Sequence, residues 1–374
     1  MQNKFFPEIK KNFGFGCMRL PMAGDEVDTV EFSKMVDAFI NAGFNYFDTA
    51  HGYLGGKSET AIKECLTSRY PRDKYLLVNK LSGSFFKSEE EIRPLIDLQL
   101  EACGVEYFDF LLMHAQEATL YERYKKCRAY ETAFDLKREG KVRHVGLSFH
   151  DRAEVLDKIL SEYPEIEIVQ IQFNYADFED ASVQSKLCLE VCQKHGKPVV
   201  VMEPVKGGSL VNLPDSAKAI LDELHGGSYA SYAIRFAASF DNIIMVLSGM
   251  GNMDMMNDNI SYMKDFKPLD EKEFEAINKV LETVKEQGAI QCTACRYCVD
   301  GCPMSIKIPD LFNCYNGKKV WNSWNYGSYY RTLTKEGGAP STCIECGACE
   351  ESCPQHLPIR ELLKEVANEF EKKE

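Results

Sequence analysis

Two cysteine runs near the C-terminus constrain this chain more than any other feature of its sequence. The first reads Cys292-Thr-Ala-Cys295-Arg-Tyr-Cys298-Val-Asp-Gly-Cys302-Pro303, and the second reads Cys343-Ile-Glu-Cys346-Gly-Ala-Cys349-Glu-Glu-Ser-Cys353-Pro354. Both follow the spacing C-x2-C-x2-C-x3-C-P, in which three thiolates bind one [4Fe–4S] cluster and the fourth binds the neighbouring cluster. This spacing predicts two clusters, one bound by Cys292, Cys295, Cys298 and Cys353 and the other by Cys343, Cys346, Cys349 and Cys302.

Zinc and disulfides explain these runs less well. A zinc site takes four ligands in one tetrahedral set, which would leave the extra cysteines of each run without a role. A disulfide framework would need an oxidising compartment, and nothing in the sequence indicates one. Iron–sulfur clusters are therefore the favoured interpretation.

The two runs resemble those of a dicluster ferredoxin. Their wide separation, with helix-like sequence over 308–312 between them, is similar to the α-helical ferredoxins rather than the compact β-rich ones. We therefore expect residues 288–374 to form a small helical domain, with a larger domain over residues 1–287.

The composition narrows the classes of function. A chain of 374 residues suits one large and one small domain. Its net charge of −13 argues against a nucleic-acid partner. No apolar run is long enough to span a membrane, and the N-terminus lacks the apolar core of a signal peptide, so we expect a cytoplasmic protein. The cysteines outside the two runs are expected to be small buried residues: Cys17, Cys65, Cys103, Cys127, Cys188, Cys192 and Cys314.

Before the cysteine runs, short apolar segments alternate with amphipathic ones, which is typical of parallel βα units. The predicted strands are Phe13–Met18, Phe44–Asp48, Tyr75–Lys80, Phe108–His114, Val142–Ser148, Ile168–Phe173, Pro198–Met202 and Ile243–Leu247. The predicted helices include Thr29–Ala42, Glu89–Ala102, Leu120–Arg138 and Ser182–His195, closed by Gly43, Gly104, Gly140 and Gly196. This pattern favours a (β/α)8 barrel over a doubly wound open sheet, since the first strand lacks a Gly-rich phosphate turn.

Polar residues stand at the predicted C-terminal ends of these strands, where (β/α)8 barrels place their active sites. They are Asp48, Tyr53, Lys80, His114, Ser148, Gln170 and Asn174. Each alone has an ordinary structural explanation, such as a helix cap, a solvated cation or a core histidine. Their occurrence at the same end of consecutive strands predicts an active site.

At these positions the sequence resembles the aldo-keto reductases. The segment Phe44–Tyr53 is similar to that family's aspartate–tyrosine segment, Val78–Lys80 to its lysine strand, and Leu111–His114 to its histidine strand. Gly140–Ser148 is similar to the family's G-K-[IV]-R-x-[IV]-G-[VL]-S stretch, and Val169-Gln170 to a strand whose glutamine contacts nicotinamide. With the cysteine runs, the chain looks like the iron–sulfur branch of that family.

The resemblance implies hydride transfer between NADH or NADPH and a small carbonyl or alcohol substrate, with Tyr53 exchanging the proton. A phenol ordinarily has a pKa near ~10, so Lys80 is expected to lower the pKa of Tyr53 by stabilising the phenolate. Asp48 would keep Lys80 charged in a dry pocket, and His114 would orient the carbonyl oxygen or share the proton transfer.

The chain departs from the family where the nicotinamide cofactor is expected. Phe149 replaces a frequent asparagine after Ser148, and Met202 stands where an aromatic residue commonly stacks on the nicotinamide. The segment Ser248–Asn259 has no cation for a 2′-phosphate, so NADH is as plausible as NADPH. The implied cofactor contacts are Ser148, Gln170, Asn174, Met202, Ser248 and Asn259, with Lys206, Gly207 and Gly208 as a pyrophosphate loop.

Hydride transfer moves two electrons, whereas each cluster moves one, and no sequence signal is specific to a flavin that could couple them. Two alternatives therefore stay open: an electron-transfer protein whose barrel binds a partner or another redox cofactor, and a reductase whose clusters are structural. The aromatic stretch Trp321–Tyr330 is expected to pack over the clusters or the barrel mouth, or to receive a redox protein partner. Charged residues 270–287 and the residues after Pro358 are both expected to form helices.

Overall fold

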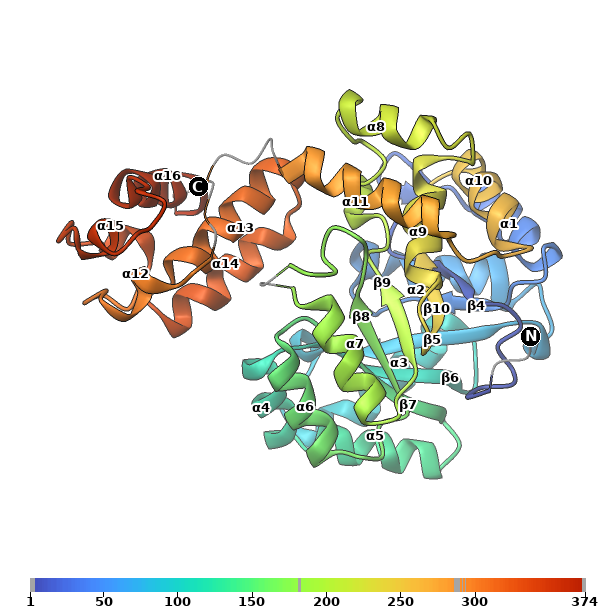
Figure 1. The fold of residues 1–374 in the computed structure, drawn as a ribbon. Coiled ribbons are helices and arrows are strands. Elements are labelled where there is room, and N and C mark those ends of the chain that lie inside the picture. The colour runs from blue at the N-terminus through green and yellow to red at the C-terminus, as the bar shows by residue number, and fades with distance from the viewer. Residues whose placement is uncertain (1–3, 181–182, 286–289, 291, 293, 372–374) are drawn as a thin grey trace. The chain divides into compact units, whose positions relative to one another are not determined.

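The computed structural model describes residues 4–180, 183–285, 290, 292 and 294–371, which form two compact units (Figure 1). The first unit holds the residues up to Glu179 together with Gln184–Val205 and Gly227–Glu271. The second holds Lys206–Gly226 and the chain from Lys272 onward, with a short segment at Asp180. The expected domain boundary between residues 287 and 288 lies outside the described residues.

The first unit is a closed barrel of eight parallel strands within the described residues, which confirms the predicted (β/α)8 fold. Around the barrel the order is β1-β10-β9-β8-β7-β6-β5-β4, so each strand pairs with its neighbour along the chain and β1 closes the ring against both β4 and β10. The strands are β1 (Phe13–Gly16), β4 (Tyr46–Asp48), β5 (Leu76–Leu81), β6 (Phe108–Gln116), β7 (Val142–Phe149), β8 (Ile168–Gln172), β9 (Val199–Met202) and β10 (Ile243–Ser248).

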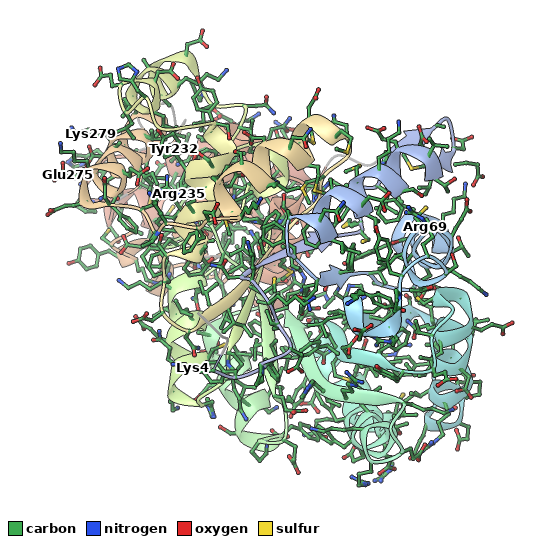
Figure 2. All side chains as sticks on the ribbon, turned by 90° about the vertical axis from the view of Figure 1, so that its right-hand side faces the viewer. Lys4, Arg69, Tyr232, Arg235, Glu275 and Lys279 are labelled. Atoms are coloured by element: carbon green, nitrogen blue, oxygen red, sulfur yellow. The ribbon has the colours of Figure 1, made fainter. Side chains whose placement is uncertain are left out.

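Helices alternate with these strands. They are α1 (Thr29–Asn41), α2 (Lys57–Ile62), α3 (Ile92–Cys103), α4 (Ala118–Lys126), α5 (Ala129–Arg138), α6 (Ala153–Glu162), α7 (Ser185–Lys194), α9 (Tyr229–Ala238) and α10 (Met253–Met263). Arg69 lies on the outer surface of the barrel unit (Figure 2). Its Nη2 donates to both carboxylate oxygens of Asp37 on α1, each at 2.8 Å. The glycines predicted to end helices have positive φ angles, as the left-handed C-terminal cap requires: Gly43, Gly104, Gly140 and Gly196.

Two local predictions were incomplete. The single helix expected over Leu120–Arg138 is two helices, α4 and α5, because Arg128 has a left-handed φ of 51° that interrupts the helical backbone. The apolar periodicity hides this break, since both helices bury one face. A two-stranded antiparallel hairpin, β2 (Met22–Ala23) and β3 (Glu26–Val27), was not predicted; its strands are too short for an alternating pattern.

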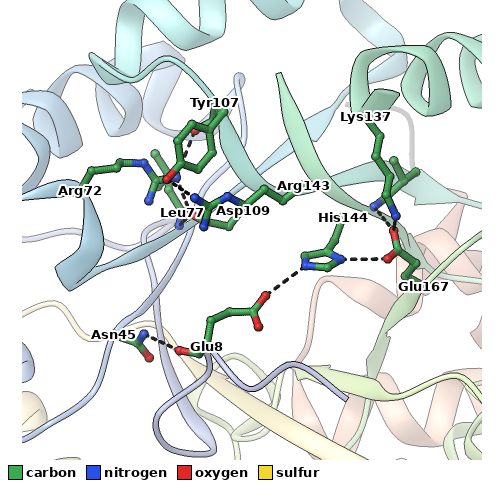
Figure 3. Close-up of polar contacts among 11 residues, drawn as sticks. Glu8, Asn45, Arg72, Leu77, Tyr107, Asp109, Lys137, Arg143, His144 and Glu167 are labelled. Atoms are coloured by element: carbon green, nitrogen blue, oxygen red, sulfur yellow. Dashed lines mark hydrogen bonds and ion pairs between the residues drawn. The ribbon is translucent and has the colours of Figure 1, made fainter. Parts of the chain in front are cut away.

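The N-terminal segment covers the end of the barrel at which the strands begin. Phe6 and Ile9 are buried among core residues contributed by several strands. Beside them, His144 on β7 contacts Glu8 through Nε2 at 3.0 Å and Glu167 through Nδ1 at 2.8 Å (Figure 3). Asn45 also donates to the backbone carbonyl of Glu8 at 2.9 Å, so the segment is held by both apolar and polar contacts.

A second polar cluster at this end surrounds the buried carboxylate of Asp109. Arg72 donates to Asp109 Oδ2 at 2.6 Å and Arg143 to Oδ1 at 3.2 Å, while the Leu77 amide donates to Oδ2 at 2.7 Å (Figure 3). The two guanidinium groups lie 4.0 and 4.1 Å from the ring of Tyr107. Paired charges at this end of such a barrel serve stability, because the active site lies at the other end.

Glu167 gives this end of the barrel a pH dependence. Its burial raises the carboxyl pKa, but hydrogen bonds from His144, Lys137 and the Val145 amide outweigh burial and lower the pKa to about 2. A carboxyl group whose pKa is lower in the folded than in the unfolded chain stabilises the fold at pH values above its unfolded pKa. This stabilisation is lost as the pH falls toward about 2. We expect Glu167→Gln to remove roughly 3 kcal/mol of unfolding free energy at pH 7. Denaturant melts between pH 7 and pH 3 should show a shallower decline in the variant; parallel declines would contradict the assignment.

In the second unit, the described residues from Lys272 onward are mostly helical. Its helices are α8 (Asp215–Asp222), α11 (Glu271–Lys285), α12 (Tyr297–Asp300), α13 (Ile308–Trp321), α14 (Asn325–Glu336), α15 (Ala348–Glu351) and α16 (Ile359–Phe370). Both helices predicted from charge and periodicity, α11 and α16, are present. No helix among the described residues has the length and apolar character needed to cross a bilayer.

The aromatic stretch forms part of the core of this unit. Tyr326, Tyr329 and Tyr330 are buried, and Phe370 of α16 stacks on Tyr330 with ring centroids 4.5 Å apart. Gly317 on α13 admits the Tyr326 ring, because a Cβ at that position would lie 2.3 Å from it. Trp324 is the exception, with 60% of its surface exposed.

Candidate functional site

Asp48 and Lys80 form a buried ion pair at the C-terminal ends of adjacent strands. Lys80 Nζ donates to Asp48 Oδ1 at 2.5 Å and to the Thr49 carbonyl at 2.9 Å. The second carboxylate oxygen of Asp48 accepts from Gln170 Nε2 on β8 at 3.1 Å. Because Asp48 and Lys80 are almost fully buried, each charge depends on these partners rather than on water.

Tyr53 lies beside this pair on the loop that follows β4. Lys80 Nζ is 5.0 Å from the centre of the Tyr53 ring, and the His114 ring centroid is 6.0 Å from that of Tyr53. The loop turns sharply after Tyr53, with left-handed φ angles of 53° at Leu54 and 66° at Gly55. The structure therefore brings Asp48, Tyr53, Lys80 and His114 together.

The expected lowering of the Tyr53 pKa is wrong in its net direction. Burial of the phenol raises its pKa, and the negative charges of Asp48 and Glu203 add to that effect. The Lys80 cation lowers the pKa, as predicted from sequence, but does not offset burial. Tyr53 is therefore protonated at neutral pH. The spacing of residues along the chain predicts that Lys80 lies near Tyr53, but it does not predict how deeply the Tyr53 phenol is buried.

The surroundings of Lys80 and His114 determine the charge of each side chain at neutral pH. Burial lowers the pKa of Lys80, but Asp48 and Tyr53 raise it by more than burial lowers it, so Lys80 is charged. Burial and the Lys80 cation hold the pKa of His114 well below its usual range, so His114 is neutral at pH 7. Ser82 Oγ lies 2.5 Å from His114 Nδ1, which directs the other ring nitrogen away from Ser82.

Several residues near the Asp48–Lys80 pair were not predicted from the sequence. His150 lies directly after β7, two positions beyond Ser148, and burial and Lys80 lower its pKa to about 4. Glu203 follows β9 with a left-handed φ of 57°, and its Oε1 lies 3.8 Å from Arg19 Nη2. Counting two positions beyond Ser148 or Lys80 would have found His150 and Ser82; no local signal marks Glu203.

The residues expected to contact nicotinamide occupy the ends of β7 to β10. Ser148 Oγ accepts from the Ala115 amide at 2.8 Å. Asn174 donates to Asp177 Oδ2 at 2.6 Å and to the Glu203 carbonyl at 3.0 Å, so its amide nitrogen is committed within the protein. Met202 ends β9, directly before Glu203.

The remaining expected cofactor residues divide between the two units. Asn259 on α10 donates to Ser248 Oγ at 2.8 Å, within the barrel unit. Lys206, Gly207 and Gly208 belong to the second unit, where the buried Lys206 places its ammonium 4.8 Å from the centre of the Tyr326 ring. A tight turn with left-handed φ angles at Lys206 and both glycines follows β9.

The eight cysteines of the two runs line two hollows. One is lined by Cys292, Cys295, Cys298 and Cys353, and the other by Cys302, Cys343, Cys346 and Cys349. Among the described residues, no three His, Cys, Asp or Glu side chains lie close enough to bind one metal ion. Each hollow thus brings together three cysteines of one run and one cysteine of the other. All seven other cysteines are buried, as predicted.

Comparison with known proteins identifies both parts of the chain. Residues 12–282 match the aldo/keto reductase family, and residues 291–358 match a 4Fe-4S dicluster domain. The chain belongs to the aldo/keto reductase family. It is an oxidoreductase of that family with a dicluster domain at its C-terminus.

Curated relatives of this aldo/keto reductase include a reductase and a dehydrogenase. NADH-specific methylglyoxal reductase from Escherichia coli is 26% identical over 47% of this chain and 57% of its own length, so the match spans little more than half of that relative. L-galactose dehydrogenase from Arabidopsis thaliana is 24% identical over 73% of this chain and 91% of its own length.

Solved structures share the barrel fold of this aldo/keto reductase. The aldo-keto reductase from Klebsiella pneumoniae in complex with NADPH has a TM-score of 0.58 at 18% identity, over 73% of this chain and 95% of that one. The holo form of aldo-keto reductase AKR11C1 from Bacillus halodurans has a TM-score of 0.57 at 22% identity, over 72% and 92% of the two chains.

Proposed function

We propose that this protein reduces a small carbonyl compound, or oxidises the corresponding alcohol, with a nicotinamide dinucleotide. The observation that carries the proposal is the buried Asp48–Lys80 pair set against the Tyr53 ring, with His114 beside it. This arrangement offers one proton donor, one fixed cation and one neutral imidazole around the same point.

In the reducing direction Tyr53 gives its phenolic proton to the oxygen of the substrate carbonyl. Its raised pKa favours this direction at neutral pH, because the group starts protonated. Lys80 stabilises the phenolate that remains, and Asp48 keeps Lys80 charged. Neutral His114 donates a hydrogen bond to the same oxygen. Alcohol oxidation needs the phenolate of Tyr53, so we expect it to accelerate as pH rises.

The donor set of the barrel fits a nicotinamide, which when bound exchanges a hydride with the substrate carbon. Ser148 accepts one hydrogen bond from the protein and keeps its hydroxyl proton to give, while Gln170 donates one N–H to Asp48 and keeps its carbonyl oxygen. These two side chains would hold a carboxamide, with Met202 packing nearby. Asn174 supports the site through Asp177, and Ser248 and Asn259 would bind further along the dinucleotide.

We further propose that the two hollows bind [4Fe–4S] clusters, with the ligand sets predicted from spacing. Support comes from the mixing of the two runs: Cys353 lines the hollow of the first run and Cys302 that of the second. The clusters would supply one-electron transfer. Cys295 and Cys346 are exposed, one in each hollow, so electrons can reach both clusters from the surface.

That exposure favours electron exchange with a redox protein over a purely structural role, and it supports a second candidate function. In this alternative the protein transfers electrons and its barrel serves a partner or another redox cofactor. Two observations separate the candidates: whether the nucleotide reduces a carbonyl compound, and whether it reduces the clusters.

The first assay is anaerobic and uses methylglyoxal, the substrate in the name of one relative, with NADH or NADPH. We expect methylglyoxal-dependent oxidation of the nucleotide, with NADH at least as effective as NADPH because 248–259 lacks a cation. Cluster absorbance is followed in the same cuvette. No turnover with methylglyoxal or a panel of aldehydes, together with bleaching of the clusters by either nucleotide, would favour the electron-transfer function instead.

A further inference from the structure

A second carboxylate, Glu59 on α2, is buried next to the strand that carries Lys80. Only 1% of its surface is exposed, and its oxygens accept three hydrogen bonds. Asn79 donates to Oε1 at 2.8 Å, and Gln99 donates to the same oxygen at 3.4 Å. His51 Nδ1 lies 2.7 Å from Oε2 and must be the donor, because a carboxylate only accepts.

Two of these donors come from segments that carry proposed catalytic residues, and the third bonds to one of those segments. Asn79 precedes Lys80 on β5, and its Oδ1 accepts from the Lys80 amide at 2.8 Å. Gln99 on α3 bonds the same strand, since its Nε2 donates to the Lys80 carbonyl at 3.1 Å. His51 lies on the loop after β4, two residues before Tyr53.

We infer that Glu59 is a positioning residue: it ties the loop that carries Tyr53 to the strand that carries Lys80, and so sets the separation of phenol and ammonium. This rests on the proposed function, in which that separation governs proton transfer. The Tyr53 loop has left-handed backbone at Leu54 and Gly55, a strained conformation for leucine that persists only where surrounding contacts hold it. The His51–Glu59 bond supplies such a contact immediately before the turn.

The separation of the Tyr53 phenol and the Lys80 ammonium can be followed through the pKa of the phenol. The charged groups that act on the phenol are Lys80, Asp48 and Glu203, with neutral His114 alongside, and Lys80 alone lowers its pKa. Loosening the loop moves Tyr53 away from Lys80, so the phenol pKa rises. A variant that only weakened the fold would leave the folded protein's phenol unchanged.

The test compares two variants in which a histidine loses its contacts with glutamate. His51→Phe removes the bond beside Tyr53, while His144→Phe removes matched bonds to Glu8 and Glu167 at the opposite end of the barrel. The phenol pKa is measured by tyrosinate difference absorbance against the same variant carrying Tyr53→Phe, which needs no substrate. We expect His51→Phe to raise it by about one unit and to lower kcat/KM by up to about 10²-fold. His144→Phe should change neither.

Glu59→Gln is the conservative variant. Its carbonyl oxygen can still accept from Asn79 and Gln99, and its amide can donate to His51 after a change of tautomer, so the connection survives without the charge. We expect the Tyr53 pKa to stay near the wild-type value in Glu59→Gln. An unmoved pKa in His51→Phe, or an equal shift in Glu59→Gln, would overturn the positioning role. Absence of carbonyl reduction in the wild type, with the pKa shift present, would refute the proposed function alone.

Discussion

Tyr53→Phe is expected to lower carbonyl reduction by about 10³-fold, because the substrate oxygen then has no phenolic proton donor. Phenylalanine fills the same space, so the Asp48–Lys80 pair and its bond to Gln170 should remain. The dissociation constant for NADH, measured by fluorescence titration, should change less than threefold. The measurement is kcat/KM under anaerobic conditions, with NADH held saturating.

Tyr130→Phe is the matched control. Tyr130 on α5 is also a buried tyrosine of the barrel unit, and its hydroxyl donates to Gln116 Oε1 at 2.7 Å. It should lose stability and keep its turnover. Unchanged turnover in Tyr53→Phe would remove Tyr53 from the mechanism, whereas equal losses in both variants would show that any buried hydroxyl matters.

The iron content of double cysteine variants is expected to reveal which thiols share a cluster. Cys298 and Cys353 line the same hollow, whereas Cys349 lines the other. Cys298→Ala with Cys353→Ala should therefore lower reconstituted iron from about eight atoms per chain to about four. Cys349→Ala with Cys353→Ala should leave almost none, because each cluster loses a ligand.

The opposite order of iron content would mean that each run binds its own cluster alone. Cys314→Ala is the control, since Cys314 is buried in the core of the same unit and donates to the Tyr326 carbonyl at 3.2 Å rather than lining a hollow. It should retain about eight iron atoms. Thermal melts of the same variants address the structural alternative, which requires unfolding whenever one cluster is lost.

Structural features that depend on residues close together along the chain were predictable from the sequence. All eight barrel strands were located because each is a short apolar run between breaks, and the glycine caps marked helix ends by their left-handed backbone. The break between α4 and α5 was missed, since one non-glycine residue with a positive φ leaves no trace in the periodicity.

Within the candidate site, the sequence by itself determined the residue types at the strand ends. Parallel strands place their C-terminal ends at one edge, so Asp48, Lys80 and His114 had to meet once the barrel was assumed. The spacing of the cysteine runs likewise indicated two clusters, because the geometry of a cubane constrains residues only a few positions apart.

Only the tertiary structure decided how these residues behave. The Tyr53 pKa is raised because burial outweighs the Lys80 cation, and burial is a property of everything packed around the phenol. The Glu59 network joins His51, Asn79 and Gln99 across as many as 40 residues of chain, which no local spacing encodes. Hydrogen bonds and desolvation act through space, so their balance exists only once the barrel has closed.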